Sequence, residues 1–251
     1  MNIVFVSLGS KGNATLIEQD DTLIQIDMGV PKKAIREGLD LLNRDFKDIQ
    51  AVFITHEHAD HVGTLSLYRD AYPVYCGKGT LPDISEEHEL HEGEAVDIGS
   101  IAVMPFRSSH DANNPMNFII LAGGQKFGYV TDTGFIRPHG VALLKNCDFY
   151  LMESNYGVKE LAEGPYPPLL KRRIRSKHGH LSNIDSAKYA SNFIGPRTKQ
   201  IFLGHISDEN NTPEIAEQTY RKVFRDNEVS LEKIKLVAIP QKTLQIGGDL
   251  L

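Results

Sequence analysis

Two patterns of hydrophobic and polar positions along the chain predict its secondary structure. Short apolar runs bounded by glycine, proline and small polar residues are typical of strands. The predicted strands are Ile3–Val6, Thr15–Glu18, Thr22–Ile26, Ala51–Thr55, Pro73–Cys76, Ile101–Phe106, Phe118–Leu121, Lys126–Thr131, Phe149–Met152, Ile201–Gly204, Leu236–Ile239 and Leu244–Ile246.

Apolar residues three or four positions apart predict the helices between these strands. Prolines in a first turn, and a Ser or Thr just before it, indicate where several helices begin. Six helices are predicted. One begins at Pro31, and a second contains Val62, Leu65 and Tyr68. Two more cover Pro138–Lys145 and Pro165–Ser176, and the last two begin at Ser182 and Thr212.

Strands occur in runs that helices interrupt, which predicts a mixed α/β protein. In such a protein, sheets pack on each other and helices flank them. The length of 251 residues fits one domain. The sequence contains no fixed-period repeat, low-complexity tract or linker, so we predict a single domain over 1–251.

Composition places this chain among ordinary globular proteins. Hydrophobic residues are 41% and charged residues 24%, which excludes wholesale disorder. With two cysteines, Cys76 and Cys147, far apart, a disulfide scaffold and a cysteine zinc finger are excluded. No secretory signal and no membrane-length apolar run is visible. We therefore expect a cytoplasmic protein with no membrane partner.

The sharpest chemical feature follows the predicted strand Ala51–Thr55. The sequence there reads Thr55-His56-Glu57-His58-Ala59-Asp60-His61, with four potential metal ligands within six residues. The two histidines of an extended turn project toward one side, and the Asp-His pair stands where the next helix begins. Imidazole suits zinc and other transition metals, and carboxylate suits harder ions such as manganese. The pattern favours a metal site over the alternative, a histidine-rich surface turn.

Three later residues could complete such a site. His110, Asp132 and His205 each lie at or just beyond the end of a predicted strand. Loops at strand ends are where functional side chains concentrate. Each residue alone is a weak indication of a metal site. Together with the segment Thr55–His61, called the histidine loop below, they form one pattern.

This ordered pattern resembles the metallo-β-lactamase fold family. Asp27 in Ile-Asp-Met-Gly, the His-x-His-x-Asp-His loop, His110, Asp132 and His205 correspond to the five motifs of that family. The resemblance implies an αββα sandwich, with two mixed sheets face to face and helices outside. In more detail the chain is similar to the YycJ/WalJ-like branch, whose relatives are DNA exonucleases and phosphodiesterases. The marks of that branch are Gly9-Ser10-Lys11-Gly12-Asn13, Ser109-His110-Asp111-Ala112, Glu153-Ser154-Asn155, Gly179-His180-Leu181-Ser182-Asn183 and the stretch from His205 to Pro213. The family commonly has His after Glu-Ser-Asn, whereas Tyr156 stands there in this chain.

Carried over residue by residue, the resemblance implies two divalent metal ions. One ion would be held by His56, His58 and His110. The other would be held by Asp60, His61 and His205, with Asp132 bridging the two and Asp60 also catalytic. Asp27 resembles the residue that supports the histidine loop by hydrogen bonds without binding metal, although a turn aspartate is the alternative. Zinc and manganese suit these ligands, and iron and magnesium are compatible with them.

Charge distribution points to the substrate more clearly than net charge does. A net charge of −6 argues against nucleic acid. However, residues 171–180 contain five Lys and Arg and no acidic residue, while the rest of the chain carries 22 Lys and Arg against 33 Asp and Glu. A local basic segment can bind a polyanion although the remaining surface repels it. A solvated helix face is the alternative interpretation.

Substrate contacts are predicted near this basic segment and in the first glycine-rich loop. A helix beginning at Ser182 would present free N–H groups and a positive dipole end to an anion. His180 is also a candidate general acid that protonates the leaving oxygen, with a structural histidine as the alternative. The predicted substrate-binding residues are Lys11, Asn13, Arg175, Lys177, His180, Ser182 and Asn183.

These features predict a hydrolase. Two divalent ions can activate a shared water and stabilise charge on the attacked group. The basic segment favours a phosphodiester substrate, cleaved by attack of a metal-bound hydroxide on phosphorus, and the resemblance implies a DNA 5′-exonuclease. The alternatives are a phosphodiesterase of small or cyclic nucleotides, a thioester, lactam or lactone hydrolase, and a non-catalytic metal-dependent nucleic-acid-binding module.

Overall fold

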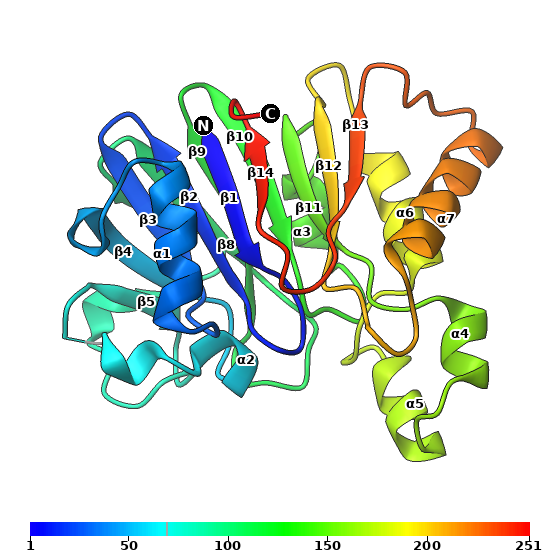
Figure 1. Ribbon diagram of the computed structural model, residues 1–251, viewed down its shortest axis with the longest axis horizontal. Helices are drawn as coiled ribbons and strands as arrows, with labels where there is room; N and C mark the ends of the chain where they lie inside the picture. The colour runs from blue at the N-terminus through cyan, green and yellow to red at the C-terminus, as the bar shows by residue number, and fades with distance from the viewer. Residues whose placement is uncertain (69) are drawn as a thin grey trace. The chain divides into compact units, whose positions relative to one another are not determined.

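The computed structural model describes residues 1–68 and 70–251, and its internal contacts group them into two compact units. The first unit comprises 1–107, 112–125 and 242–251, and the second comprises 108–111 and 126–241. Within the described residues the strands fall into two mixed seven-stranded sheets (Figure 1). The predicted single domain stays a prediction.

One of these sheets lies wholly in the first unit. Its strands, in spatial order, are β14 (Gln245–Gly248), β1 (Asn2–Ser7), β2 (Ala14–Gln19), β3 (Thr22–Ile26), β4 (Ile49–Ile54), β5 (Val74–Gly77) and β6 (Glu89–Leu90). Pairing is antiparallel from β14 to β3 and parallel from β3 to β6. The parallel half leaves the carboxyl end of β4 at one edge of the sheet, where the histidine loop begins.

Helix α1 (Lys32–Leu41) covers one face of this sheet (Figure 1). Ile35 and Leu39 of α1 join the apolar cluster made by alternate residues of the strands. Gly38 lets the helix approach closely, since a Cβ atom there would come within 2.7 Å of the Val6 side chain. Burial of this apolar surface at about 25 cal/mol per Å² is the main force holding the helix in place.

The opposite face of the sheet packs on an antiparallel meander in the same unit. The strands of the meander are β7 (Val96–Ile98), β8 (Ile101–Arg107) and β9 (Met116–Ala122). Phe53 of β4 meets Phe118 of β9 edge to face, with ring centroids 6.0 Å apart. Because neighbours along a strand point to opposite faces, Val52 and Ile54 lie on the α1 side. Sheets packed face to face with a helix outside confirm the predicted fold class.

The second unit is built on parallel strands. They are β10 (Gln125–Val130), β11 (Phe149–Glu153), β12 (Gln200–Gly204) and β13 (Lys235–Ala238). Parallel neighbours bring their carboxyl ends to one edge of the sheet. Asp132, Glu153 and His205 therefore occur at the same edge, directly at or after the ends of three strands.

Helices α3 (Pro138–Leu143), α6 (Asn183–Phe193) and α7 (Pro213–Asp226) belong to this unit. Helices α6 and α7 pack on each other. In addition, α6 packs on β11, and α7 packs on β12 and β13. Their starts are those predicted, because the Ser182 hydroxyl accepts from the Asp185 N–H and the Thr212 hydroxyl accepts from the Ile215 N–H. Such caps satisfy N–H groups that have no partner inside the helix.

Two helix predictions were wrong in extent. The helix predicted through Val62, Leu65 and Tyr68 is two pieces, α2 (Ala59–Val62) and the 3₁₀ turn η2 (Leu65–Leu67). The break occurs because the Thr64 N–H donates to Met28 O at 2.9 Å, and its hydroxyl donates to Met28 O and Val30 O. These tertiary bonds replace the helical bonds that Thr64 would otherwise make.

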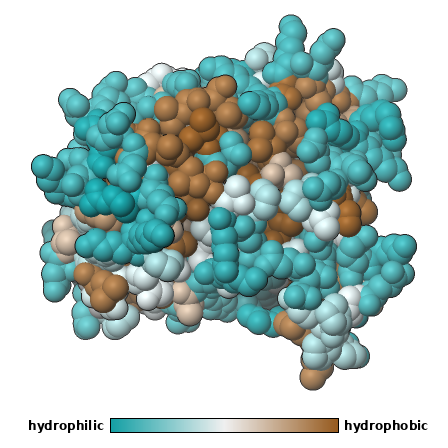
Figure 2. All heavy atoms as spheres, viewed as in Figure 1, coloured by the Kyte–Doolittle hydropathy of each residue, from teal (hydrophilic) through white to brown (hydrophobic). Residues whose placement is uncertain are grey.

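The helix predicted at Pro165–Ser176 is α5 (Pro168–Ile174), and α4 (Val158–Glu163) precedes it unpredicted. Pro167 is extended, with ψ of 150°, because a following proline disfavours the helical conformation. The α4–α5 segment has a small apolar core of its own around Leu161 and Ile174, whereas Leu169 of α5 is 77% exposed. Figure 2 shows apolar atoms among polar ones at α5. The remaining 3₁₀ turns are η1 (Phe46–Asp48) and η3 (Glu86–His88).

In the part of the chain that the structure describes, every helix is too short or too polar to span a bilayer.

Candidate metal centre

The histidine loop of the first unit gathers three imidazole rings. It leaves β4 at Thr55 and enters α2 at Ala59. The His56 ring lies 4.5 Å from the ring of His58 and 4.0 Å from that of His61, measured between centroids. Asp60 adds a carboxylate oxygen 3.5 Å from His61 Nε2. All four predicted ligands of this loop are thus neighbours within one unit.

Asp27 supports the histidine loop through hydrogen bonds. It is fully buried and adopts a left-handed backbone conformation with φ of 59°. One carboxylate oxygen lies 2.7 Å from His61 Nδ1, and the other accepts from the Thr55 N–H at 2.8 Å. Burial raises the pKa of Asp27, and the neighbouring His61 opposes part of that rise. The contact with Nδ1 leaves Nε2 of His61 as the nitrogen directed toward Asp60.

The first glycine-rich loop also packs against the histidine loop. Asn13 is buried, and its amide nitrogen lies 3.0 Å from His61 Nε2 and 3.3 Å from the Asp60 carboxylate. A Cβ atom on Gly29 would come within 1.6 Å of Asp60 O, so only glycine fits there. Lys11 lies exposed on the surface of the same loop. Phosphate contacts by Lys11 and Asn13 stay predictions, and for Asn13 the structure shows an inward-facing amide.

The second unit brings together another cluster of donors. Single ligand atoms of Asp132, Glu153, His180 and His205 lie within 4.8 Å of one another. The Asp132 carboxylate is 3.4 Å from His205 Nε2, 3.6 Å from His180 Nδ1 and 3.9 Å from His110 Nε2. Both Asp132 and His205 have positive φ, 46° and 54°, a conformation that recurs at functional sites.

Glu153 was not predicted as a site residue, although it lies at the centre of this cluster. It is fully buried, and one carboxylate oxygen is 2.7 Å from His180 Nδ1 and 3.2 Å from His205 Nδ1. The other oxygen accepts from the N–H groups of Thr133 and Leu181. Burial acts to raise the pKa of Glu153, but the charge of His180 and hydrogen bonds from His180 and His205 outweigh it and hold the pKa below its usual value. The sequence signal was an acidic residue at the end of a strand buried throughout.

His205 and His110 are each anchored through Nδ1. Asn155 places its amide nitrogen 3.1 Å from His205 Nδ1, in addition to the contact with Glu153. His110 Nδ1 lies 3.0 Å from the carbonyl oxygen of Gly179. Burial lowers the pKa of His110, which favours the neutral imidazole that binds metals.

These anchors test whether the donor set suits a metal. A metal-bound histidine usually donates its other ring N–H to a carboxylate or a carbonyl. His61, His110 and His205 all show this arrangement, with Asp27, Gly179 and Glu153 as the respective partners. Buried imidazole and carboxylate donors held in this way fit divalent metal ions.

The other predicted substrate residues of the second unit differ in exposure. Arg175 and Lys177 are exposed, whereas Ser182 and Asn183 are buried. The Ser182 hydroxyl is used by Asp185 at the start of α6, and the Asn183 amide bonds the Asn211 amide at 2.9 Å. The phosphate contacts predicted for these residues stay predictions.

Tyr156, which replaces the common histidine of the family, is a core residue. It packs with Leu161 and Ile174, and burial raises the pKa of its hydroxyl to about 12. Its carbonyl oxygen accepts from the Asn183 N–H, which ties the segment after β11 to the start of α6.

Comparison with known proteins decides the family. The model of the beta-lactamase superfamily domain matches residues 26–206, a stretch that contains every predicted metal ligand. The chain belongs to the metallo-β-lactamase superfamily. YhfI of Bacillus subtilis, a metallo-β-lactamase fold protein, superposes with a TM-score of 0.72 at 14% identity, covering 98% of this chain and 99% of YhfI. This likeness shows the shared fold.

Two relatives within the superfamily are similar over most of their length. The chain is 35% identical to exodeoxyribonuclease WalJ of Streptococcus pneumoniae serotype 2 over 224 residues, which are 84% of this chain and 83% of WalJ. It is 30% identical to exodeoxyribonuclease YycJ of Bacillus anthracis over 230 residues, 87% of each chain. The resemblance to the YycJ/WalJ-like branch is confirmed.

Proposed function

We propose that this metallo-β-lactamase superfamily member is a metal-dependent exodeoxyribonuclease. The observation that carries the proposal is the sequence similarity of the chain to WalJ and YycJ, with 35% and 30% identical residues across more than four fifths of each chain. The anchored histidines of both units supply the ligand chemistry that such an enzyme needs. DNA is accordingly the proposed substrate.

The proposed ligand sets follow the family resemblance. His56, His58 and His110 would hold one divalent ion, and Asp60, His61 and His205 would hold the other, with Asp132 shared. When bound, two such ions would supply stabilisation of charge on the phosphate and activation of water. The mixture of imidazole and carboxylate donors suits zinc or manganese.

The residues of the chain itself account for proton delivery. His180 is half-buried, and its Nδ1 is held at 2.7 Å by Glu153. This bond orients the ring and leaves Nε2 to pass a proton to the oxygen that departs from phosphorus. Glu153 acts through His180 and His205 as a positioning residue.

The general-acid role predicts how His180→Ala responds to the leaving group. On DNA the variant should lose about 10²- to 10⁴-fold in kcat, the usual contribution of a positioned general acid. On bis(p-nitrophenyl) phosphate, whose leaving group needs no proton, the loss should be far smaller. An equal loss on both substrates would contradict the role of His180 as an acid.

The basic segment 171–180 supports a nucleic-acid substrate. Arg172, Arg175 and Lys177 are exposed, while Arg173 pairs with Asp111 at 2.5 Å. Exposed cations bind the phosphate backbone without reading sequence. A site for a small nucleotide has less use for cations spread along a whole segment, so a small or cyclic nucleotide phosphodiesterase is the second candidate.

End-labelled DNA separates these two functions. Purified protein with Mn²⁺ should degrade the labelled strand, and the His58→Ala and Asp132→Ala variants should not. His139→Ala, at an exposed position outside both clusters, is the matched control and should degrade DNA normally. Turnover of cyclic nucleotides with intact DNA would favour the small-substrate enzyme, and inertness toward both would exclude both.

Polarity is the finer part of the proposal. We expect digestion from the 5′ end, as the family resemblance implies. Linear DNA carrying a blocked 5′ terminus should then survive, whereas a 3′-blocked duplex should be digested. The reverse pattern would overturn the proposed 5′ direction while leaving the exonuclease assignment in place.

A further inference from the structure

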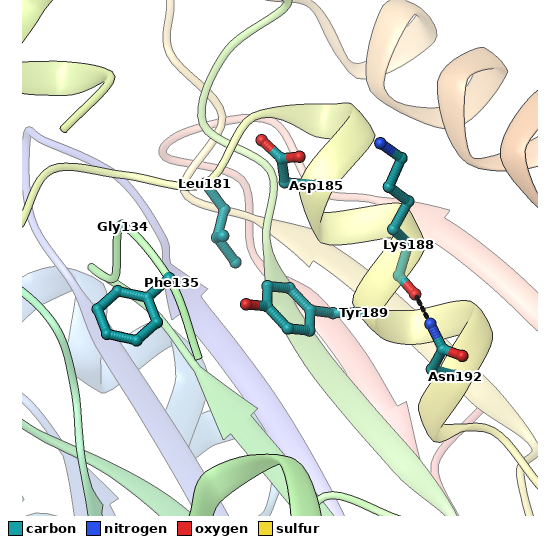
Figure 3. Close-up of a pocket in the computed structure, with 7 residues that line it drawn as sticks. All are labelled: Gly134, Phe135, Leu181, Asp185, Lys188, Tyr189 and Asn192. Atoms are coloured by element: carbon teal, nitrogen blue, oxygen red, sulfur yellow. Dashed lines mark hydrogen bonds between the residues drawn. The ribbon is translucent and has the colours of Figure 1, made fainter. Parts of the chain in front are cut away.

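A pocket of the second unit is lined in part by residues that lie one or two positions from His180 and Asp132 in the chain, and it has no assigned role. Its volume is about 340 Å³, which suits a single small ligand. Three parts of the chain form it: Gly134 and Phe135, Leu181, and the exposed side of α6. Figure 3 shows the Phe135 and Tyr189 rings on opposite sides of the pocket, with Leu181 between them.

The chain places this pocket close to the reacting groups. Gly134 follows the proposed ligand Asp132 by two residues, and Leu181 directly follows His180. A Cβ atom on Gly134 would come within 2.4 Å of the Lys177 backbone, so the basic segment packs against this wall. The Gly134 N–H also donates to Ser109 O, next to His110. A ligand here would therefore lie near the loops that carry His110, Asp132 and His180.

The walls favour a flat, largely apolar ligand. Phe135 and Tyr189 are both half-buried, so their rings are open to a ligand, and Leu181 forms a buried floor. The Tyr189 ring is held in place, because its hydroxyl accepts from the Ile136 N–H at 3.3 Å and its ring stacks on Phe193 at 5.8 Å. Two aromatic side chains, one of them rigidly fixed, form a stacking platform.

The rim adds hydrogen-bonding groups of both charge signs. Asp185, Lys188 and Asn192 are exposed side chains of α6 that line the opening (Figure 3). The Asp185 carboxylate would repel a free phosphate. A neutral ring with hydrogen-bond donors and acceptors on its edge can instead bond all three groups, the carboxylate of Asp185, the ammonium of Lys188 and the amide of Asn192.

We propose that this pocket binds the nucleobase of the nucleotide next to the scissile phosphate. The inference rests on the proposed exodeoxyribonuclease function and adds a base subsite to it. Stacking between a base and an aromatic side chain tolerates every base, so the subsite would strengthen binding without requiring a particular sequence.

Binding of small ligands tests the subsite without any cleavage. Calorimetry should show that the purified protein binds deoxyadenosine monophosphate at least about tenfold more tightly than deoxyribose 5-phosphate, the gain expected from stacking one base. Phe135→Ala and Phe135→Leu should both remove most of this difference. The leucine variant keeps an apolar side chain at this position, so the test still applies if the alanine variant does not fold. Lys222→Gln, at an exposed position of α7, is the control and should retain the difference. Equal affinity of the two ligands in the unmodified protein, or an unchanged difference in Phe135→Leu, would overturn the proposal.

Photocrosslinking locates the base on the unmodified chain. An oligonucleotide with 5-iododeoxyuridine at its end, joined by phosphorothioate linkages that resist cleavage, should crosslink to the peptide that contains Phe135 or Tyr189. Crosslinks confined to other peptides would overturn the subsite. Because neither measurement needs turnover, failure of the nuclease assay alone would remove the proposed function and leave the base subsite to be decided by binding.

Discussion

Hydrogen bonds to buried carboxylates orient three histidines of the candidate site. Asp27 holds His61 at 2.7 Å, and Glu153 holds His180 and His205 at 2.7 and 3.2 Å. An imidazole whose Nδ1 is held presents Nε2 in a fixed direction, so less ordering is required when a metal binds. Glu153 was not predicted as a site residue, because its position at a strand end does not reveal its partners, which are residues 180 and 205, far along the chain.

Asp27→Asn tests this orientation directly. Loss of a carboxylate that supports a metal-bound histidine usually weakens metal affinity by about 10- to 100-fold. We expect a drop of that size in zinc affinity, measured by competition with a chelator. Asp45→Asn, at an exposed position, is the control and should bind metal normally. Unchanged affinity in Asp27→Asn would show that the bond to His61 does not support metal binding.

The two cysteines should be unreactive in the folded protein. Cys76 and Cys147 are both buried, and burial raises the pKa of the Cys147 thiol from 9.0 to about 11. Only the thiolate reacts, so a thiol reagent at pH 8 should modify neither residue until a denaturant is added. Rapid native modification would contradict the burial.

The same shift gives a direction for stability against pH. Because the pKa of Cys147 is higher in the folded state, its contribution to the free energy of unfolding is complete below about pH 9 and is lost as pH rises toward 11. Cys147→Ala should flatten the decline measured by urea unfolding over this interval. An identical decline in the variant would contradict the assignment.

At the scale of helices and strands, local signals predicted best the helix starts that carry a side-chain cap. Ser182 and Thr212 cap α6 and α7 as the sequence indicated, because a cap bonds an N–H three residues away. The helix predicted through Val62 and Leu65 is broken, because Thr64 bonds Met28 and Val30. Bonds to distant residues leave no periodic signal in a sequence.

Thr212→Ala measures the worth of one cap. The Thr212 hydroxyl accepts from the Ile215 N–H at 3.2 Å, and loss of such a bond costs about 1 kcal/mol in the free energy of unfolding. Thr212→Ser keeps the hydroxyl and should restore most of the stability in urea unfolding. If the alanine and serine variants were equally stable, the cap would contribute nothing.

At the scale of the whole molecule, a chain of net charge −6 carries a basic segment beside its proposed phosphate site. The sequence predicted most of the candidate ligands because they are adjacent in one loop or follow strand ends. The proposal that distant ligands share a metal ion rests on the family resemblance, since no local pattern encodes such sharing. Bulk acidity lowers non-specific attraction, so binding to DNA should depend on the few exposed cations.

Salt dependence tests this balance. The slope of log affinity against log salt falls by about one for each phosphate contact removed. The double variant Arg175→Gln and Lys177→Gln should therefore weaken DNA binding and reduce this slope by about one to two. Lys222→Gln should leave the slope unchanged. An unaltered slope in the double variant would exclude the segment from the DNA-binding surface.

The central claim, a metal-dependent exodeoxyribonuclease, is tested most directly by comparing linear with covalently closed circular DNA. Chelator-treated protein should be inactive, and adding Mn²⁺ or Zn²⁺ should release nucleotides from linear DNA while the closed circle of the same sequence stays intact. Equal cleavage of the circle, or release of nucleotides without any divalent metal, would contradict the account.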